Sequence, residues 1–235
     1  MDNSSTSEAG RSHNMKRFRI LVIGLVCLVA FSVVFPGCEG GSSSSETSYW
    51  FWRSSGAFRI IELVISGNNI SGNFIESSNW IGAISGTADG DAYAITLTYS
   101  DGSTRQWTLT RSGDTMSGTT SAGGSMSISK LDYSSLAAPT VNIAGAWIPT
   151  GPTDGIQSFH FRQLGNGVVI YYYARDHAHY GYGTISGTTV SVTAYCANNT
   201  QSAWSETWTS SVVDNRLTIN WATQRQSGQV TIQRQ

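Results

Sequence analysis

The feature that most constrains the fold is a strict alternation of apolar and polar residues in short runs. The run Tyr93–Ser100 (YAITLTYS) has apolar or aromatic side chains at every second position, and Ala or Thr at the positions between them. A period of two is typical of a strand with one buried face. No stretch of eleven or more residues after residue 38 carries a helical stripe of apolar residues. We therefore predict an all-β body.

Glycine-rich and asparagine-rich turn signals separate these runs. Gly and Asn tolerate the positive φ angles of tight hairpin turns, so closely spaced turns predict antiparallel meanders. The spacing suits units of about seven or eight strands. In the first half of the body these signals are SGNN at 66–69, DGD at 89–91, SDGS at 100–103 and SGD at 112–114.

The body reads as a duplication. The motif GAISGTADG at 82–90 is repeated in similar form as GTISGTTVS at 183–191. The sequences of the two halves can be aligned along their length, and we call this alignment the overlay. We predict two tandem antiparallel β-meander barrels or barrel-like sandwiches, at 49–132 and 143–235, joined by a linker at 133–142. A single sheet system built from both repeats is the alternative. The overlay pairs Gly67 with Gly165, Phe74 with Tyr172, Gly82 with Gly183, Trp107 with Trp208 and Ile128 with Ile232.

The N-terminal segment has the layout of a secretory signal. Lys16, Arg17 and Arg19 precede an apolar run at 20–34, which has 15 residues. A membrane span needs roughly 20 apolar residues, so a helical signal segment in a leader at 1–37 is favoured over an uncleaved anchor.

The end of this segment resembles the lipobox of bacterial lipoproteins. Phe35-Pro36-Gly37-Cys38 keeps the small residue and the cysteine, while Phe35 and Pro36 depart from the usual Leu-Ala/Ser. The resemblance implies that Cys38 is acylated, as by palmitate, and becomes the first residue of a protein anchored to the membrane. A Gly/Ser tether at 38–48 follows. Glu39 is not the aspartate associated with retention in the inner membrane, which favours the outer membrane of a bacterial envelope.

The order of short motifs in the body resembles that of the small lipocalin-like β domains of bacterial lipoproteins. Its elements are G-x-W, isGt, W-t-x-t and sGdtmsGt. They cover most of 50–130 and, more weakly, 141–235. The resemblance implies small β-barrels and no catalytic signature.

Charge excludes some classes of partner. From Cys38 onward the chain has ten Lys and Arg against thirteen Asp and Glu, a net of −3, and Lys130 is its only lysine. A nucleic-acid binder or a reader of anionic lipids needs clustered cations, so neither is expected.

One segment of the second repeat could bind a metal. His177 and His179 are two residues apart, Asp176 precedes them, and His160 lies one strand earlier. Imidazoles and a carboxylate are zinc ligands. However, the alternation turns His160 outward, and the overlay places 177–179 in a connecting loop. A solvated, aromatic hairpin tip is the competing interpretation.

Aromatic residues offer a second hypothesis. Trp107, Trp208 and Trp221 fall on strands among inward apolar residues and are expected in the core. Aromatic side chains nearer to predicted loops could bind a small apolar ligand, a glycan or an envelope protein. These are Trp80, Tyr171, Tyr173, Tyr180, Tyr182 and Trp204.

No catalytic constellation or cofactor motif is present in the sequence. The G-x-S-x-G elbow is missing, and the acidic residues of the first repeat fall mostly in turns. The sequence favours a lipid-anchored extracytoplasmic binding module that is not an enzyme and has no cofactor. A metal-dependent enzyme or metal-binding protein, and a purely structural envelope protein, are the alternatives.

Overall fold

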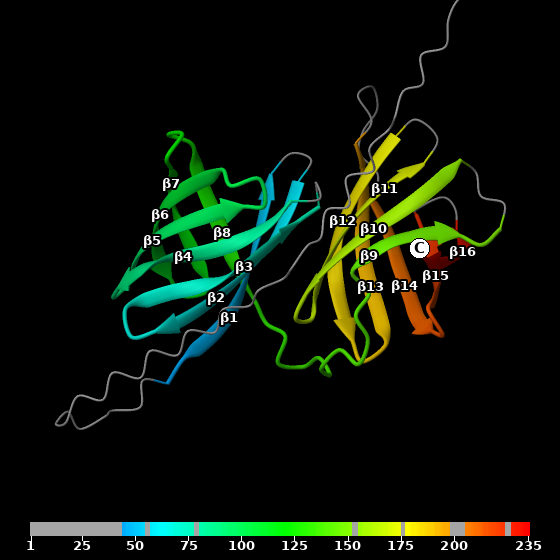
Figure 1. Ribbon diagram of the computed structural model, residues 1–235, viewed down its shortest axis with the longest axis horizontal. Helices are drawn as coiled ribbons and strands as arrows, with labels where there is room; N and C mark the ends of the chain where they lie inside the picture. Colours follow the sequence, from blue (N-terminus) through cyan, green and yellow to red (C-terminus); the bar gives the residue numbers. More distant parts are fainter. Residues whose placement is uncertain are drawn as a thin grey trace, which may run out of the picture. The chain divides into compact units, whose positions relative to one another are not determined.

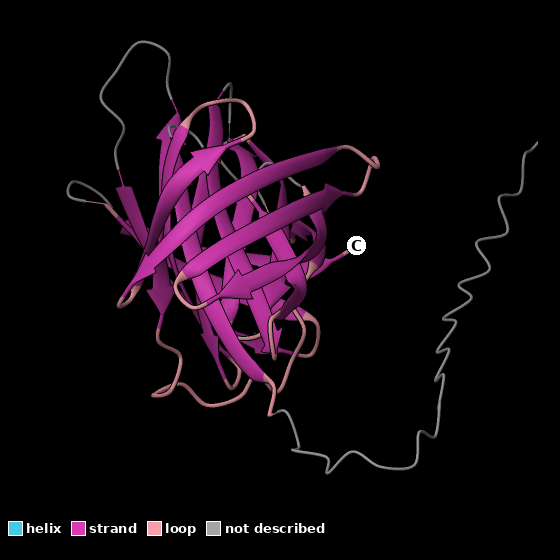
Figure 2. Cartoon of the chain, turned by 90° about the vertical axis from the view of Figure 1, so that its left-hand side faces the viewer, coloured by secondary structure: helices cyan, strands magenta, loops and turns pink. Residues whose placement is uncertain are grey.

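The computed structural model describes residues 44–54, 57–77, 80–151, 155–174, 177–197, 205–223 and 227–235. The leader and Cys38 lie outside these ranges. The described chain is all-β, as predicted (Figure 2). Within those ranges no helix is long and apolar enough to cross a membrane.

Within the described ranges, sixteen strands form two separate closed antiparallel barrels, drawn from blue to green and from green to red in Figure 1. The prediction of two tandem barrels is confirmed, and the single sheet system is not observed. The first barrel comprises β1 (Glu46–Ser54), β2 (Ala57–Ser66), β3 (Asn69–Glu76), β4 (Ile81–Asp89), β5 (Ala92–Tyr99), β6 (Thr104–Ser112), β7 (Thr115–Thr120) and β8 (Ser125–Leu131). The second comprises β9 (Gly145–Pro149), β10 (Ile156–Leu164), β11 (Gly167–Ala174), β12 (His177–Ser186), β13 (Thr189–Ala197), β14 (Ser205–Val213), β15 (Arg216–Ala222) and β16 (Ser227–Arg234).

Each barrel closes by pairing its first strand with its last. Tyr49 of β1 pairs with Leu131 of β8, and Pro149 of β9 pairs with Ile232 of β16. β1 begins at Glu46, so the last residues of the predicted tether belong to the sheet. Among the described strands, closure therefore leaves no edge strand in either barrel.

The alternation in the sequence places successive side chains on the inside and the outside of the barrel wall. On β5 the inward residues are buried, whereas Ala94 and Thr98 between them are exposed. Ser and Thr therefore coat the outer wall. The buried inward residues of this strand are Tyr93, Ile95, Leu97 and Tyr99.

Two-residue turns close one end of each barrel. Gly67, Gly90 and Gly113 have positive φ in the first barrel, and Gly165 and Gly187 do so in the second. The turn between β14 and β15 has positive φ at Asp214 and Asn215, as a type I′ turn requires. The connections at the opposite end are mostly longer.

The two barrels confirm the duplication but correct its register in one place. Phe74 pairs with Gly82, and the equivalent Tyr172 pairs with His179. His179 therefore occupies the position of Gly82. Gly183 is equivalent to Gly86, since the two pair with Val192 and Ile95 in the two barrels. The overlay of Gly82 on Gly183 is wrong by four residues.

The segment between β8 and β9 is attached to the second barrel. The amide nitrogen of Ala137 donates to the Ser186 hydroxyl, and the Asn166 side chain donates to the Ala137 carbonyl over 2.8 Å. Ile143 is buried, and its carbonyl accepts a hydrogen bond from the indole of Trp147. Ser42–Gln235 form one compact unit.

Candidate functional site

Two of the histidines proposed as metal ligands, His160 and His179, do not converge. Phe159 of β10 pairs with Tyr172, which pairs with His179, and all three are buried inside the second barrel. His160 follows Phe159, so its side chain points to the outer wall, as the alternation predicted. His160 and His179 therefore lie on opposite faces of the sheet.

His179 belongs to the core and not to a solvated loop. It lies within β12 and is 4% exposed. Its Nδ1 is 2.8 Å from the Tyr172 hydroxyl, and the two rings stack with centroids 4.3 Å apart. The prediction of a connecting loop at 177–179 is wrong, because the correct register places these residues on a strand.

The proposed metal cluster has two further members, Asp176 and His177. Asp176 and the side chain of His177 lie outside the described residues. On the outer wall, Nε2 of His160 is 3.3 Å from the Ser158 hydroxyl. Across the described part of the chain, no three His, Cys, Asp or Glu side chains lie close enough to hold a metal ion.

Two of the tyrosines proposed as ligand-binding residues are partly covered by the first barrel. The rings of Phe51 and Phe58 lie 4.4 and 4.9 Å from the ring of Tyr182. Tyr180 and Tyr182 join a mainly apolar cluster that spans both barrels. We call this cluster the inter-barrel contact. Its members are Phe51, Phe58, Ile60, Ile75, Leu131, Leu164, Val169, Tyr180, Tyr182 and Tyr195.

Burial in the inter-barrel contact changes the titration of its tyrosines. Burial raises the pKa of Tyr182, a hydrogen bond with Tyr195 raises it further, and the Arg53 guanidinium opposes the rise. Burial also raises the pKa of Tyr180, with smaller contributions from Tyr171 and Tyr173. Both shifts fit hydroxyl groups partly shielded from water.

The other aromatic candidates lie in different places. Tyr171 packs against Tyr180 on the outer wall with ring centroids 5.3 Å apart, and Tyr173 is 39% exposed. Trp80 is also 39% exposed and packs edge-on against Tyr99 of the first barrel. Trp204 lies outside the described residues.

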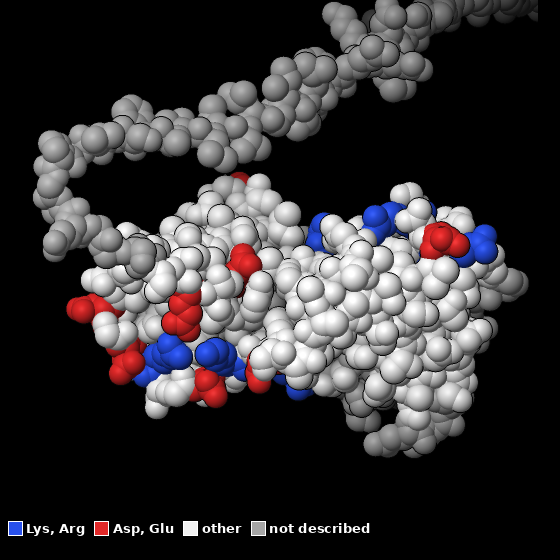
Figure 3. All heavy atoms as spheres, turned by 90° about the horizontal axis from the view of Figure 1, so that it is seen from below, with Lys and Arg blue, Asp and Glu red and all other residues white. Residues whose placement is uncertain are grey.

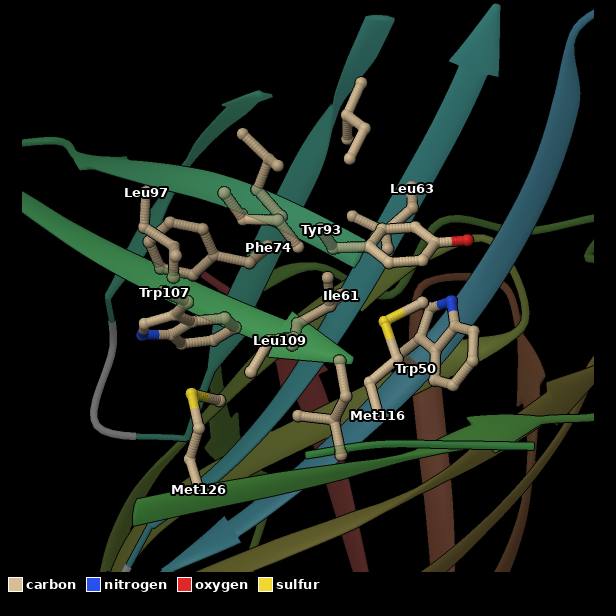
Figure 4. Close-up of a cluster of buried hydrophobic side chains, with 14 of the residues drawn as sticks. Trp50, Ile61, Leu63, Phe74, Tyr93, Leu97, Trp107, Leu109, Met116 and Met126 are labelled. Carbon is tan, nitrogen blue, oxygen red and sulfur yellow. The ribbon is translucent and has the colours of Figure 1, made fainter. Parts of the chain in front are cut away.

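Side chains fill the interiors of both barrels. Figure 4 shows Trp50, Phe74 and Trp107 converging with aliphatic and methionine side chains inside the first barrel. The second interior holds Trp147, Phe159 and Trp208 among aliphatic residues. Eight strands enclose a space that side chains can just fill, and here they do so.

A buried ion pair lies inside the first barrel. Arg59 is 2% exposed, and its Nε donates to Oε2 of Glu76 over 2.9 Å while Nη2 contacts the same oxygen. Nη2 also donates to the Tyr99 hydroxyl over 3.1 Å. The guanidinium carbon lies between 4.8 and 5.8 Å from the ring centroids of Trp52, Phe74, Trp107 and Tyr99.

The alternation in the sequence contains a signal for this pair. Ile61 and Leu63 point inward on β2, so a period of two also turns Arg59 inward. The same rule turns Glu76 inward from Phe74 on β3. Two opposite charges at inward positions of adjacent strands predict a buried pair.

A groove of about 620 Å³ lies on the outside, where strands β3–β5 of the first barrel face β10 of the second. Its size falls within the usual range of ligand pockets. Trp80 is not one of its lining residues; its ring packs against that of Tyr99, which belongs to the core of the first barrel. The lining residues are Asn73, Phe74, Ile75, Ile81, Gly82, Ala83, Thr98, Tyr99, Ser100, Ala144, Arg162 and Gln163. We call this site the outer groove.

The two barrels carry different side chains at the positions that form the outer groove. Asn73, Ala83 and Thr98 form one register row across β3, β4 and β5. The equivalent row of the second barrel is Tyr171, Tyr180 and Tyr195. Large rings fill the outer wall there, whereas small side chains leave it hollow in the first barrel.

Charge is sparse around these sites. Strands β12 and β13 contain no Lys, Arg, Asp or Glu, and the face shown in Figure 3 has long stretches without a charged side chain. Arg162 is the one ionised residue among the described side chains that line the outer groove.

Comparisons with known proteins leave the family open. No protein-family model matches the chain, and no curated protein matches it significantly. Among solved structures, the chain is similar to Aeromonas veronii immune modulator A at 10% sequence identity, over 80% of this chain and 85% of that chain, with a TM-score of 0.31. A similarity at this level carries no argument about fold or function.

Proposed function

We propose that this chain is a lipid-anchored binding module of the bacterial cell envelope, and that its ligand contacts the outside of the barrels. The observation that carries the proposal is the outer groove, which lies between two barrels whose interiors are filled by their own side chains. A small ligand inside either barrel would have to displace packed tryptophans.

The anchor rests on the lipobox-like sequence that ends at Cys38 and on the Gly/Ser tether after it. A single acyl chain gives marginal membrane binding, whereas several chains on one cysteine give stable anchoring. The tether would let the barrels turn freely at the membrane surface. Glu39 favours the outer membrane as the final location.

Metabolic labelling with a fatty-acid analogue tests the anchor. The wild-type chain is expected to incorporate the label and to fractionate with the outer membrane. Cys38→Ser should abolish labelling, whereas Cys196→Ser should leave it intact, because Cys196 lies on β13 of the second barrel. An unlabelled wild-type chain would contradict the lipoprotein assignment.

Site-directed photocrosslinking in intact envelopes tests the binding role. A photoreactive amino acid at Ala83, on the floor of the outer groove, is expected to capture a discrete product. The same residue at Ala94 is the control, since Ala94 is also exposed on the outer wall but does not line the groove. Equal capture at both positions would contradict a specific site there.

The filled interiors also support a second candidate, a purely structural envelope protein. Such a protein needs no ligand. A chain that fractionates with the envelope and yields no crosslinked product from the outer groove would favour this role over binding.

A further inference from the structure

We infer that a hollow on the outer wall of the second barrel binds a neutral glycan, through a row of hydroxyl groups flanked by one carboxylate and one guanidinium. The hollow has a volume of about 600 Å³, within the usual range of ligand pockets, and we call it the β14–β16 hollow. It shares no described lining residue with the outer groove, so the inference goes beyond the proposed function. Its described lining residues are Ser211, Val213, Asp214, Arg216, Thr218 and Thr231.

The floor of the β14–β16 hollow is a row of three hydroxyl side chains. Ser211, Thr218 and Thr231 are paired in register across β14, β15 and β16, which lie side by side in Figure 1. Leu217 and Ile232 next to them are buried inside the barrel, so the alternation turns the row outward. The side-chain oxygens of Thr218 and Thr231 are 3.3 Å apart, which places two groups that can both donate and accept beside each other.

The next row and the turn beyond it form the rim of the hollow. Val213 pairs with Arg216, and Asp214 follows Val213 in the turn with a φ of 50°. All three residues are exposed. In the described part of the chain, the side chains of Asp214 and Arg216 make no hydrogen bond or ion pair with another residue. A carboxylate and a guanidinium are therefore available to a ligand at one side of the hydroxyl row.

The first barrel has an equivalent hydroxyl row without the charged rim. Each barrel has a two-residue turn between its sixth and seventh strands. Around this turn, Gly113 and Thr115 of the first barrel stand where the second barrel has Asp214 and Arg216. The two charges therefore distinguish the second barrel at positions where the strand pairing is the same. The equivalent row of the first barrel is Thr110, Ser117 and Ser127.

The groups around the hollow suit a saccharide. A sugar ring carries hydroxyl groups that donate and accept, and the hollow offers them a carboxylate acceptor, a guanidinium donor and three Ser/Thr hydroxyls. Val213 is 62% exposed, and its methyl groups can pack against the C–H groups of a ring. An anionic ligand would face Asp214 and a cationic one would face Arg216, so the charges favour a neutral ligand. An acyl chain would leave all of these polar groups unpaired on burial.

Saturation-transfer NMR with neutral trisaccharides tests this inference. The full chain is reconstituted in nanodiscs of a zwitterionic phospholipid and mixed in turn with maltotriose, cellotriose and triacetylchitotriose, with empty nanodiscs as the blank. We expect transfer to at least one trisaccharide. Thr218→Trp should weaken its binding by about tenfold or more, because the ring fills the hydroxyl row. Ser117→Trp, at the equivalent position of the first barrel, should leave the binding unchanged.

Two substitutions copied from the first barrel test the rim. Asp214→Gly and Arg216→Thr introduce the residue types found at positions 113 and 115, and glycine accepts the positive φ of position 214. Each should weaken trisaccharide binding by about ten- to hundredfold, as expected when a hydrogen bond to a charged group is lost. Unchanged melting temperatures will show that these variants are folded. Binding that survives both substitutions unchanged would overturn the inference.

The remaining outcomes separate the glycan from its alternatives. A wild-type chain that gives no transfer to any of the three trisaccharides would overturn the inference. Transfer to the zwitterionic peptide trialanine, lost in both rim variants and without transfer to a trisaccharide, would assign the hollow to a peptide and would also overturn it. Neither result bears on photocrosslinking at Ala83 in the outer groove, so the proposed function would stand.

Discussion

The ring of Phe58 in the first barrel packs against the ring of Tyr195 in the second, with centroids 5.2 Å apart. Arg53 lies over the ring of Tyr195 at 4.8 Å and over that of Phe58 at 5.5 Å. Phe58 is on the outer wall of its barrel, yet it is 3% exposed. The second barrel therefore supplies much of the burial of this side chain, and the two barrels should unfold as one cooperative unit.

Phe58→Ala is expected to uncouple the barrels. Removing a buried phenylalanine typically costs about 3–5 kcal/mol, and here the loss falls on the inter-barrel contact. Differential scanning calorimetry should show one transition for the wild type and two for the variant. Val213→Ala is the control, because Val213 is largely exposed and surface changes of this kind usually cost less than about 0.5 kcal/mol. A single, unshifted transition in Phe58→Ala would contradict the coupling.

The buried pair of Arg59 and Glu76 supports a double-mutant test. Arg59→Met alone should cost about 3–5 kcal/mol, because it removes the guanidinium charge that offsets the buried Glu76 carboxylate. Arg59→Met with Glu76→Leu should recover most of this loss, since a well-packed apolar pair can replace a buried ion pair.

Urea unfolding measures both variants, provided that their m-values agree. Recovery in the double variant would show that the pair is not required for stability. A double variant as unstable as the single one would show instead that the aromatic rings around Arg59 depend on its guanidinium.

Alkaline pH should weaken the inter-barrel contact. The pKa of Tyr182 is raised above its ordinary value of 10.0, mainly by burial. The folded state thus favours the protonated hydroxyl, so its contribution to stability is fully present below pH 10 and is lost as the pH rises through the folded pKa.

Tyrosinate absorbance, followed together with calorimetry, should show the barrels separating above pH 10 in the wild type. Tyr182→Phe cannot ionise at this position and should delay the separation to higher pH. Tyr173→Phe should leave the transition in place, because Tyr173 is exposed and outside the inter-barrel contact. Identical alkaline transitions in the wild type and Tyr182→Phe would count against this origin.

The faces of the strands could be predicted from the sequence, but what covers each face could not. The alternation correctly turns Ile61 and Phe159 inward and His160 outward. It equally turns Tyr182 outward, but Tyr182 was proposed as a ligand-binding residue because it lies near a predicted loop. A period of two carries no information about a second barrel that packs on the outer wall, and for the same reason the outer groove could not be predicted.

The error at His179 has one physical cause. In both halves a glycine that points inward is followed four residues later by a turn glycine, as Gly86 by Gly90 and Gly183 by Gly187. Gly82 precedes Gly86 by the same interval. A slip of four residues preserves the inward and outward faces, so the alternation could not detect it, and the overlay moved His179 from a strand into a loop.

Gly86 and Gly183 occupy equivalent positions in the two barrels, so alanine should destabilise both of them to a similar extent. A Cβ at Gly86 would lie 2.1 Å from the carbonyl oxygen of Ala94, and one at Gly183 would lie 1.9 Å from that of Ser191. The absence of a side chain at these glycines permits this close approach of the neighbouring strand. Gly86→Ala and Gly183→Ala should each lower the free energy of unfolding by about 1–3 kcal/mol, the usual cost of overpacking.

Gly124→Ala is the matched control for both variants. Its nearest neighbour would be the Thr120 hydroxyl at 3.6 Å, an ordinary contact, and its φ is not positive. Denaturant unfolding should give similar losses for the two inward glycines and little change at Gly124. If Gly82→Ala and Gly183→Ala were costly while Gly86→Ala was neutral, Gly86 would not be the counterpart of Gly183, and the register of the repeat would have to be redrawn.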